Sequence, residues 1–451
     1  MAGRRLNKLA IWMNGEYVGC WSKRTGVEEL QYDNLWVENE RGRPLSLSLP
    51  FTPGNQKYRG DNVKFYFDNL LPDSTDIRER LAQKLDSRST SPFDLLAELG
   101  RDCVGAIQLL PPDKVPIKID SISCKPLTEK GVANILRNTV SNNPLGHQDT
   151  GGDLRISLAG AQEKTALLWH DNQWCEPTGS TPTTHIFKLP LGLVGNMKAD
   201  MHESVENEWL CSKIVAAFGL PVAHCEPGQF EDQKVLIVER FDRKYSSDNS
   251  WIIRLPQEDM CQAKATSPLK KYQKDGGPGI TDCMKILDGA NKPATDKQIF
   301  FKAQIIFWLL MATDGHSKNF SIRHISRDKY ELTPLYDILS AHPIIGRRND
   351  QVAIQKAKMA MAVRGSKNYY LIQRIQRRHF IQHARTVGIS TTEADKIITD
   401  ILDSTENISN DIYEILPDAF PINLANKILQ GMLKQARIMA GQCSDIKSGA
   451  K

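Results

Sequence analysis

The spacing of apolar residues changes along this chain, and that change limits the folds open to it. Up to about residue 255 the apolar residues form short runs or alternate with polar ones, which is typical of strands, whereas beyond about residue 290 they recur with the period of a helix. We expect a β-containing part followed by a helical part, with a ligand bound in the cleft between them. The helical part is predicted to contain helices over 296–312, 380–387, 392–401, 412–416 and 423–440.

The first 110 residues have the pattern of a small β-rich domain. Two short apolar runs are joined by Asn14-Gly15, a pair that favours the tight turn of a β-hairpin. The further elements expected there are a half-buried strand over 45–49, where leucines alternate with serines, helices over 65–71 and 94–99, and a strand over 104–110.

Three further segments are predicted after this domain. Residues 111–153 are rich in Pro, Asn, Ser and Gly and are expected to be a linker with one weak helix over 127–137. Residues 154–255 alternate strand and helix patterns, and residues 256–451 are expected to form the helical part. The elements expected within 154–255 are strands over 165–170, 184–189 and 235–238 and a helix over 204–218 that Ser204 caps.

Composition excludes several classes of protein. With 40% hydrophobic and 25% charged residues the chain is neither disordered nor fibrous, and its longest apolar run, residues 305–312, is too short to span a bilayer. The apolar stretch 9–13 is too short for the core of an export signal, so we expect a cytoplasmic protein. The nine cysteines are scattered and form no C-x-x-C pair, which predicts neither disulfides nor a zinc site. A net charge of +5 does not by itself indicate nucleic-acid binding.

A possible catalytic loop follows the longest apolar run. Neither a P-loop nor a dinucleotide-binding glycine motif occurs in the chain. Asp314 stands five residues before Asn319, which is the spacing of a kinase catalytic loop, where the Asp accepts the proton of the attacking hydroxyl and the Asn holds magnesium. Asp337 follows an apolar residue and suits the bridging of Mg²⁺ to phosphate oxygens. The alternative for the first pair is an Asp-Gly turn that ends a helix.

Three other features agree with a kinase. Lys188 lies in a predicted strand, on the opposite face from its apolar neighbours, where it could pair with phosphates; the alternative is an ordinary surface lysine. Glu206 or Glu208 could orient that lysine, or either could be a solvated side chain. The small residues of segment 157–164 would let backbone N–H groups approach phosphates, although an ordinary tight turn has the same composition.

Seven segments together resemble the HipA-type toxins, the serine/threonine kinases of bacterial toxin–antitoxin pairs. They are residues 155–164, 184–190, 238–243, 254–262, 275–279, 314–319 and 332–340, and the resemblance extends over nearly the whole chain. It implies an α+β, two-lobed, protein-kinase-like fold related to the phosphoinositide kinases, with an extra N-terminal β-rich domain and a helical C-terminal lobe. Ala312 and Thr313 stand where eukaryotic kinases have His-Arg, so eukaryotic activation-loop control does not carry over.

The resemblance also implies the site residues. Asp314 is the expected catalytic base, Asn319 and Asp337 the magnesium ligands, and Ser157 the autophosphorylated serine. The expected ATP-binding residues are Ala159, Gly160, Ala161, Gln162, Glu163, Lys164, Lys188, Val238, Glu239, Phe241, His316, Asn319 and Asp337. ATP and Mg²⁺ are the cofactors that this set implies.

A basic stretch over 364–385 contains six Lys and Arg residues and no acidic one. Such a run can neutralise DNA phosphates, and the alternative is a solvated helical face. In the resembled family the toxin binds a small dimeric helix-turn-helix antitoxin of the HipB type on operator DNA. Arg374 and Arg378 match positions that approach the DNA backbone in that family.

The sequence thus predicts an ATP-dependent protein serine kinase that acts as a growth-arresting toxin and co-represses its own operon. The family implies a translation component as the substrate, such as the aminoacyl-tRNA synthetase for glutamate, and a location in the bacterial cytoplasm or, with the antitoxin, on the nucleoid. No membrane partner is expected. Two alternatives remain at this point: a kinase of small molecules or lipids on the same fold, and a catalytically silent corepressor.

Overall fold

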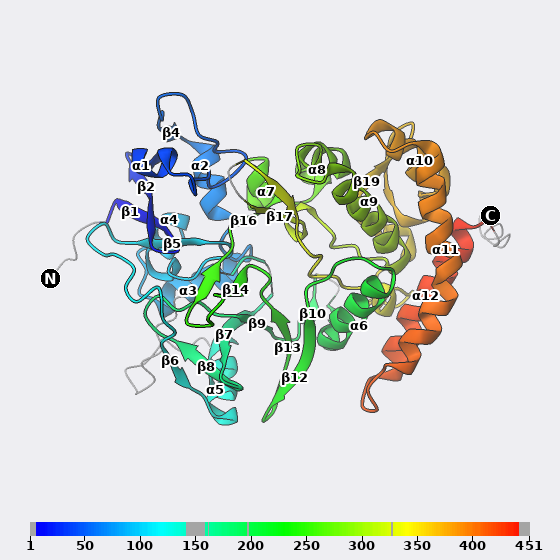
Figure 1. The fold of residues 1–451 in the computed structure, drawn as a ribbon. Helices are drawn as coiled ribbons and strands as arrows, with labels where there is room; N and C mark the ends of the chain where they lie inside the picture. Colours follow the sequence, from blue (N-terminus) through cyan, green and yellow to red (C-terminus); the bar gives the residue numbers. More distant parts are fainter. Residues whose placement is uncertain (1–5, 141–157, 161, 196–197, 326–327, 442–451) are drawn as a thin grey trace. The chain divides into compact units, whose positions relative to one another are not determined.

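The structure is a computed structural model that describes residues 6–140, 158–160, 162–195, 198–325 and 328–441 (Figure 1). It divides into two compact units, each assembled from separate stretches of the chain. The first unit comprises residues 1–189, 228–271 and 321–333, and the second comprises residues 190–227, 272–320 and 334–451. The chain passes between the units several times, so the change of pattern near residue 255 does not mark a single boundary between them.

The N-terminal part of the first unit is a five-stranded antiparallel sheet with strand order β4-β3-β2-β1-β5, covered by helices. Its elements are β1 (Lys8–Met13), β2 (Glu16–Arg24), β3 (Val27–Tyr32), α1 (Asn34–Glu38), β4 (Tyr58–Arg59), α2 (Asp61–Asp68), α3 (Thr75–Lys84), α4 (Pro92–Leu99) and β5 (Ile107–Leu110). The predicted hairpin at Asn14-Gly15 is confirmed, with φ of 46° and 85° at the two turn residues. Trp21 of β2 stacks on Phe67 of α2 with ring centroids 3.9 Å apart, so the sheet and α2 share one core.

The predicted strand over residues 45–49 is wrong. This segment turns, because its backbone binds the hydroxyl of Tyr32, which accepts from Leu45 N at 2.8 Å and donates to Leu49 O at 2.6 Å. The serines between the leucines are engaged within the protein: Ser46 is fully buried and donates to Glu258 Oε2 at 2.5 Å, and the partly buried Ser48 donates to Gln262 O at 2.8 Å. The alternation of leucines and serines therefore reflects apolar packing and hydrogen bonding within the protein rather than a strand with one solvated face.

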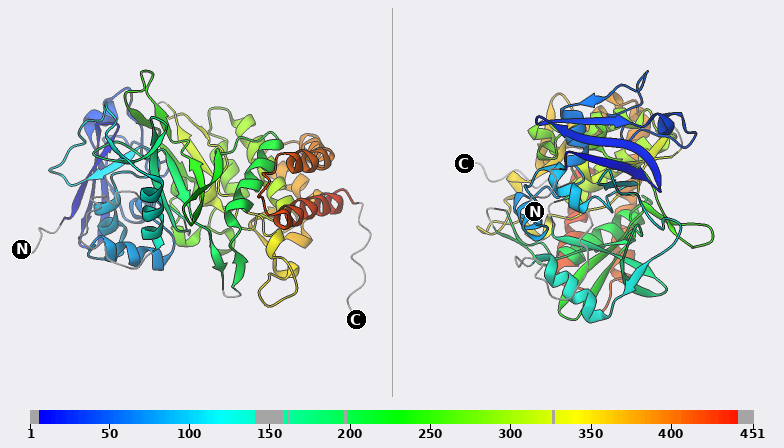
Figure 2. Two further views of the ribbon diagram at one scale, coloured as in Figure 1. Left: turned by 90° about the horizontal axis from the view of Figure 1, so that it is seen from below. Right: turned by 90° about the vertical axis from the view of Figure 1, so that its left-hand side faces the viewer.

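A six-stranded sheet forms the second part of the first unit, with strand order β12-β13-β9-β7-β8-β6. Its elements are β6 (Cys124–Pro126), β7 (Lys164–His170), β8 (Gln173–Pro177), β9 (His185–Lys188), β12 (Cys225–Phe230) and β13 (Gln233–Glu239), with helix α5 (Glu129–Val140). Helix α5 packs Val132 and Leu136 against Leu167 and Phe187 of the sheet, so it covers the face that these side chains share (Figure 2). Lys188, next to Phe187, lies on the opposite face.

Short elements complete the first unit. They are β14 (Arg243–Tyr245), β15 (Ile252–Arg254), β16 (Gln257–Asp259), α7 (Met260–Ala263), β17 (Ser321–His324) and β18 (Tyr330–Leu332). Glu258 of β16 is fully buried, and its carboxylate accepts from Ser46, from Leu47 N and, at 2.9 Å, from His324 Nε2. The segment 254–262 therefore ties the N-terminal sheet to β17 within this unit.

The second unit is mainly helical. Its elements are β10 (Gly192–Val194), β11 (Ala199–Met201), α6 (Ser204–Ala217), α8 (Ile280–Leu287), α9 (Pro293–Leu310), β19 (Lys358–Arg364), β20 (Asn368–Leu371), α10 (Arg377–Thr386), α11 (Thr391–Glu414) and α12 (Ile422–Met439). Helices α11 and α12 pack on one another (Figure 1).

Two details of the helix predictions are wrong. The stretch 392–401 and residues 412–414 belong to one helix, α11, which ends at Glu414, because buried residues such as Ile401, Thr405 and Ile408 continue its inner face between them. Ser204 is the first residue of α6 rather than its cap, since its hydroxyl accepts from Leu191 N at 2.9 Å.

The expectations about cysteines and about membrane-spanning helices can be compared with the described part of the chain. Its eight cysteines are all free thiols. None of its helices is long and apolar enough to cross a membrane.

Candidate active site

The predicted catalytic loop lies in the second unit, directly after helix α9. The helix ends at Leu310, and the side-chain amide of Asn319 then donates to the backbone oxygen of Asp314 at 3.0 Å and to that of Asp337 at 3.5 Å. One buried amide thus holds together the two segments that carry the predicted carboxylates. The structure brings Asp314, Asn319 and Asp337 into one place, as their spacing predicts.

The three side chains of this loop differ in exposure. The Asp314 side chain is 53% exposed, as a base that meets an external hydroxyl must be, whereas Asn319 is 6% exposed. His316 is buried, and its Nε2 lies 3.8 Å from Asp314 Oδ1. The loop therefore presents one accessible carboxylate, that of Asp314, next to the buried side chains of His316 and Asn319.

The segment that carries Asp337 is held by the backbone on one side and by a tyrosine on the other. Leu335 forms a parallel bridge with Val222, and Tyr336 donates its hydroxyl to Lys318 O at 2.9 Å. Asp337 itself has φ of 61°, a conformation that non-glycine residues adopt rarely and that is common at functional sites. The structure thus fixes this carboxylate in an unfavourable backbone conformation next to the catalytic loop.

The donor set of this loop fits magnesium. The side-chain nitrogen of Asn319 donates to two backbone oxygens. The side-chain oxygen of Asn319 is therefore the atom that can bind a cation. Asp337 adds a carboxylate, and Mg²⁺ prefers such oxygen ligands and is commonly held by only one or two protein side chains together with phosphates. Within the described residues no cluster of three or more His, Cys, Asp or Glu side chains could hold a metal ion.

Two lysines lie side by side on the six-stranded sheet of the first unit. Lys188 of β9 is 5% exposed, so it is not an ordinary surface lysine, and it pairs in register with Lys164 of β7. Residues directly opposite one another on paired strands point to the same face of the sheet, so the side chains of Lys164 and Lys188 share one face.

The turn before β7 is shaped around one of these lysines. Gly160 has φ of 111°, a conformation that favours glycine, and a Cβ added there would lie 2.5 Å from Lys164 Nζ. The turn is anchored by Asp73, whose backbone N donates to Gly160 O at 2.9 Å. The backbone at Gly160 therefore runs close to the ammonium group of Lys164.

The other predicted residues of segment 157–164 are only partly described. Ser157 and Ala161 lie outside the described residues. Gln162 donates to Leu189 O, and Glu163 forms an ion pair with Arg80 of α3. Burial raises the pKa of Glu163, while Arg80 opposes that shift.

The predicted adenine-binding residues lie at the end of β13. Val238 is buried and pairs with Ile186 of β9, Glu239 is the last residue of the strand and is exposed, and Phe241 is partly buried. In the second unit, Glu208 of α6 is 3% exposed and Glu206 is more exposed. Which of the two glutamates orients Lys188 stays a prediction.

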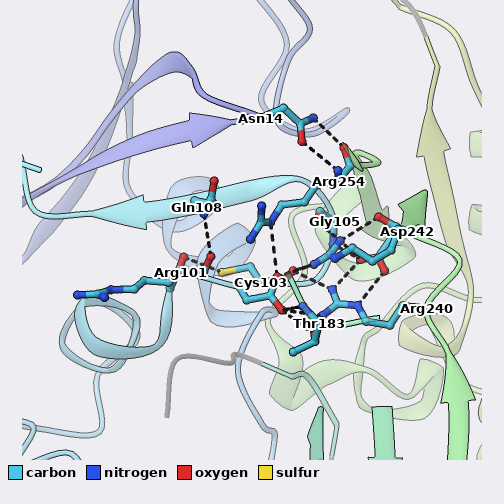
Figure 3. Close-up of polar contacts among 12 residues, drawn as sticks. Asn14, Arg101, Cys103, Gly105, Gln108, Thr183, Arg240, Asp242 and Arg254 are labelled. Atoms are coloured by element: carbon cyan, nitrogen blue, oxygen red, sulfur yellow. Dashed lines mark hydrogen bonds and ion pairs between the residues drawn. The ribbon is translucent and has the colours of Figure 1, made fainter. Parts of the chain in front are cut away.

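A buried ionic network in the first unit was missed by the sequence analysis. Asp102, after helix α4, accepts from Arg243 Nη2 at 2.9 Å and from the hydroxyl and backbone N of Thr183 at 2.7 and 3.0 Å. Figure 3 labels Thr183, Cys103 and Arg240 of this network. Arg240 Nη1 lies 3.3 Å from the same carboxylate, and both arginines donate to Cys103 O. These arginines come from segment 238–243, so the residues that follow β13 are locked to the N-terminal sheet domain.

A second carboxylate and a third arginine extend this network. Asp242 accepts two hydrogen bonds from Arg240, at 3.0 and 2.8 Å, and one from Gly105 N at 2.7 Å. Arg254 Nε lies 3.5 Å from Asp102 Oδ1, and its backbone N and O bond to the side chain of Asn14, both at 2.9 Å (Figure 3). We call Asp102, Arg240, Asp242, Arg243 and Arg254 the buried arginine network.

The network holds three guanidinium groups against two carboxylates. Burial alone would raise the pKa of Asp102, but Arg243, Arg240 and Arg254 outweigh it and hold the pKa of Asp102 well below its usual value. Burial lowers the pKa of Arg254 to about 10, against the attraction of Asp102. Asp102 is therefore ionised at neutral pH and compensates more than one arginine.

The basic stretch 364–385 is not one helical face. It runs through β19, β20 and α10, and Arg377 within it pairs with Asp395 of α11 at 2.8 Å. Arg374 and Arg378 are exposed, and neither forms an ion pair with a carboxylate of the described residues. The structure thus leaves these two guanidinium groups accessible, while Arg377 is engaged within the protein.

Comparison with known proteins identifies the family. A family model of the HipA-like C-terminal domain matches residues 156–408, and a model of the HipA N-terminal domain matches residues 9–110. The chain belongs to the HipA family. It is 32% identical over 439 residues to the protein Y4mE of Sinorhizobium fredii, which is named as a kinase, and this match covers 95% of the chain and 98% of Y4mE.

Two HipA proteins extend the comparison. The serine/threonine-protein kinase toxin HipA of Shewanella oneidensis is 26% identical over 69% of each chain. A Shewanella oneidensis HipA solved with HipB and operator DNA has the same fold, with a TM-score of 0.76, 21% identity, and coverage of 96% of this chain and 97% of that one. The predicted α+β, kinase-like fold is confirmed, and the chain is a kinase of the HipA toxin family.

Proposed function

We propose that this HipA-family kinase uses ATP and Mg²⁺ to phosphorylate a serine or threonine of a protein, as the toxin of a toxin–antitoxin pair. The observation that carries the proposal is the Asn319 amide, which bonds to the backbone of both Asp314 and Asp337. It holds an accessible carboxylate and a carboxylate in a strained conformation at one site. Phosphoryl transfer needs mainly positioning and charge neutralisation from the protein, which is what this arrangement offers.

Each group of the second-unit loop has a part in this reaction. Asp314 accepts the proton of the attacking hydroxyl, and its 53% exposure supports this role. Asn319 and Asp337 hold Mg²⁺, which when bound neutralises charge on the transferred phosphoryl group. His316 lies beside Asp314 and near the phosphates.

The residues of the first unit bind the nucleotide. Lys188 and Lys164 pair with its phosphates, and their direct pairing on neighbouring strands supports this because it puts both side chains on one face of the sheet. Backbone N–H groups of residues 159–161, with Gln162 and Glu163, approach the same phosphates. Val238, Glu239 and Phe241 hold the adenine.

The substrate we propose is a component of translation, with glutamyl-tRNA synthetase as the first candidate, because the family implies it. The test is incubation with labelled ATP, with and without a bacterial lysate, followed by mass spectrometry of whatever becomes labelled. A labelled synthetase supports the proposal. A labelled metabolite or lipid without any phosphoprotein would identify a small-molecule kinase, and no labelling at all would indicate a silent corepressor.

We also propose a HipB-type helix-turn-helix antitoxin and operator DNA as partners, with action in the cytoplasm and, in that complex, on the nucleoid. Support comes from the Shewanella oneidensis HipA solved with HipB and operator DNA, and from the exposure of Arg374 and Arg378. Exposed guanidinium groups without a carboxylate partner are suited to DNA phosphates.

Changing both Arg374 and Arg378 to Glu is expected to weaken binding of the toxin–antitoxin complex to operator DNA. Each lost phosphate contact lowers the slope of log affinity against log salt by about one, so the double variant should lose about two. Binding measured at several salt concentrations checks this expectation.

The matched control for this DNA experiment is the double variant Lys125→Glu and Lys130→Glu, which makes the same charge change at two exposed residues of the first unit. It should keep most of the salt slope, and both double variants should keep kinase activity. Equal DNA affinity of the Arg374/Arg378 variant and the unmodified protein at every salt concentration would show that these arginines do not contact DNA.

Phosphorylation of Ser157 is expected to abolish ATP binding and toxicity. The phosphate adds a charge of about −1.5 to −2 three residues before Gly160, where it must repel the nucleotide phosphates or draw the loop toward a cation such as Arg155 or Lys188. Calorimetric titration with ATP and Mg²⁺ compares the purified phosphoprotein with the same protein after phosphatase treatment. Ser157→Ala is the control that should keep ATP affinity, and equal affinities of the two phosphorylation states would rule the switch out.

A further inference from the structure

Tyr272 contacts Asp314, the proposed catalytic base. Its hydroxyl donates to Asp314 Oδ1, and both residues belong to the second unit. The edge of its ring meets His316 at an interplanar angle of 87°, with centroids 5.1 Å apart. Two contacts therefore place this tyrosine against the catalytic loop.

The backbone of Tyr272 is fixed by the turn that follows it. Its carbonyl oxygen accepts from the backbone N of Asp275 and of Gly277, both at 3.0 Å, and Gly276 takes the left-handed conformation with φ of 95° that closes the turn. Gln273 Oε1 accepts from Ala362 N at 2.7 Å, which ties the turn to strand β19. The glycine-rich segment 275–279 thus builds a rigid support for the tyrosine.

The contacts of the Asp314 carboxylate are all on one oxygen. Tyr272 donates to Oδ1, and His316 Nε2 lies 3.8 Å from the same atom. Among the described residues none bonds to Oδ2. A carboxylate held by one oxygen keeps its other oxygen in a defined direction, which is what a general base needs to meet an incoming hydroxyl.

We propose that Tyr272 is a positioning residue that holds Asp314 through Oδ1, so that Oδ2 accepts the proton of the protein substrate's hydroxyl. The inference rests on the proposed role of Asp314. Tyr272 transfers no proton in this scheme: the substrate's O–H bond breaks, its proton goes to Asp314 Oδ2, and the oxygen forms a bond to the γ-phosphorus of ATP as the bond to ADP breaks. The turn 272–277 makes the tyrosine rigid enough for this work.

The test is Tyr272→Phe, which removes the hydroxyl and keeps the ring. Loss of a hydrogen bond to a charged group predicts a fall in kcat of about tenfold or more, while the dissociation constant for ATP and the melting temperature stay within the error of the wild-type values. The matched control is Tyr58→Phe, which removes a tyrosine hydroxyl bonded to Pro50 O at 2.6 Å in the N-terminal sheet domain and should leave kcat unchanged.

Three results would overturn the inference. A kcat within twofold of the wild-type value would show that the hydroxyl does not matter, and a parallel fall of kcat, ATP affinity and melting temperature would show a merely structural role. A rise in kcat, with phosphate found on Tyr272 of the wild-type protein, would show that the tyrosine competes with the substrate instead.

Asp314→Asn, assayed beside these variants, separates the inference from the proposed function. If Asp314→Asn keeps full activity, the assignment of the base is wrong whatever Tyr272 does. If Asp314→Asn is inactive and Tyr272→Phe is as active as the wild type, only the role of Tyr272 is wrong.

Discussion

The Asp314→Asn protein is expected to be inactive in the labelling assay, a loss of about a thousandfold or more, while its fold is unchanged. The amide has nearly the shape of the carboxylate but cannot accept the proton of the attacking hydroxyl. Asp337→Ala should be inactive as well, because removal of a metal carboxylate takes away charge neutralisation worth several kcal/mol, on the order of a thousandfold in rate. Toxicity in cells should disappear with either change.

The control for these two variants is Asp400→Asn, at an exposed position of helix α11. It should label substrate at the wild-type rate, and all three proteins should melt at the temperature of the wild type. Wild-type labelling by Asp314→Asn would show that another group is the base.

Asp102→Asn is expected to cost about 3–5 kcal/mol of stability, because it removes one partner of a buried ionic network and leaves the other charges uncompensated. After the change three buried arginines face only the carboxylate of Asp242. Denaturant unfolding and melting temperature measure the loss. Because the network joins segment 238–243 to the N-terminal sheet domain, the variant should also bind ATP more weakly.

The stability difference between the wild type and Asp102→Asn should depend on pH in a definite direction. The pKa of Asp102 is lowered in the folded protein, where the arginines outweigh the effect of burial. Such a carboxylate contributes stability that is fully present above its unfolded pKa of about 4 and is lost as the pH falls through its lower folded value. The difference should therefore be constant above about pH 5 and should shrink in acid below about pH 4.

The matched control for this stability experiment is Asp113→Asn, which makes the same chemical change at an exposed residue of the first unit. It should change stability by less than about 0.5 kcal/mol at every pH. An Asp102→Asn protein as stable as this control would mean that the buried network does not stabilise the fold.

Much of the candidate site could be predicted because its signals are local. Asp314 and Asn319 lie within one loop after an apolar helix, with the spacing of a kinase catalytic loop, and the Asn319 amide bonds to the backbone oxygen of Asp314. The opposite faces of Lys188 and Phe187 follow from the period of a strand. The catalytic and binding roles of these residues stay predictions, since only the proposed variants can test them.

Other parts of the structure gave no local signal or a misleading one. The leucines and serines of 45–49 have the alternation of a half-buried strand, yet Ser46 is buried against Glu258, 212 residues away in the sequence. The basic stretch 364–385 resembles one solvated face, yet Arg377 is engaged by Asp395 while Arg374 and Arg378 are exposed. In both cases a distant partner decides what a side chain does, and residue patterns do not report such partners.

The sequence by itself determined the hairpin at Asn14-Gly15, the strand that carries Lys188, the loop that carries Asp314 and Asn319, and the resemblance to HipA kinases, because periodicity and motif spacing act over a few residues. Only the tertiary structure decided which charges meet in the interior and what touches the base. Asp102 meets Arg240 and Arg243 across 138 and 141 residues, and Tyr272 reaches Asp314 across 42. Such contacts form only when segments that are distant in the sequence meet in the fold. The free energy of burying an ion or of holding a carboxylate therefore depends on these distant partners and not on the neighbours in the sequence.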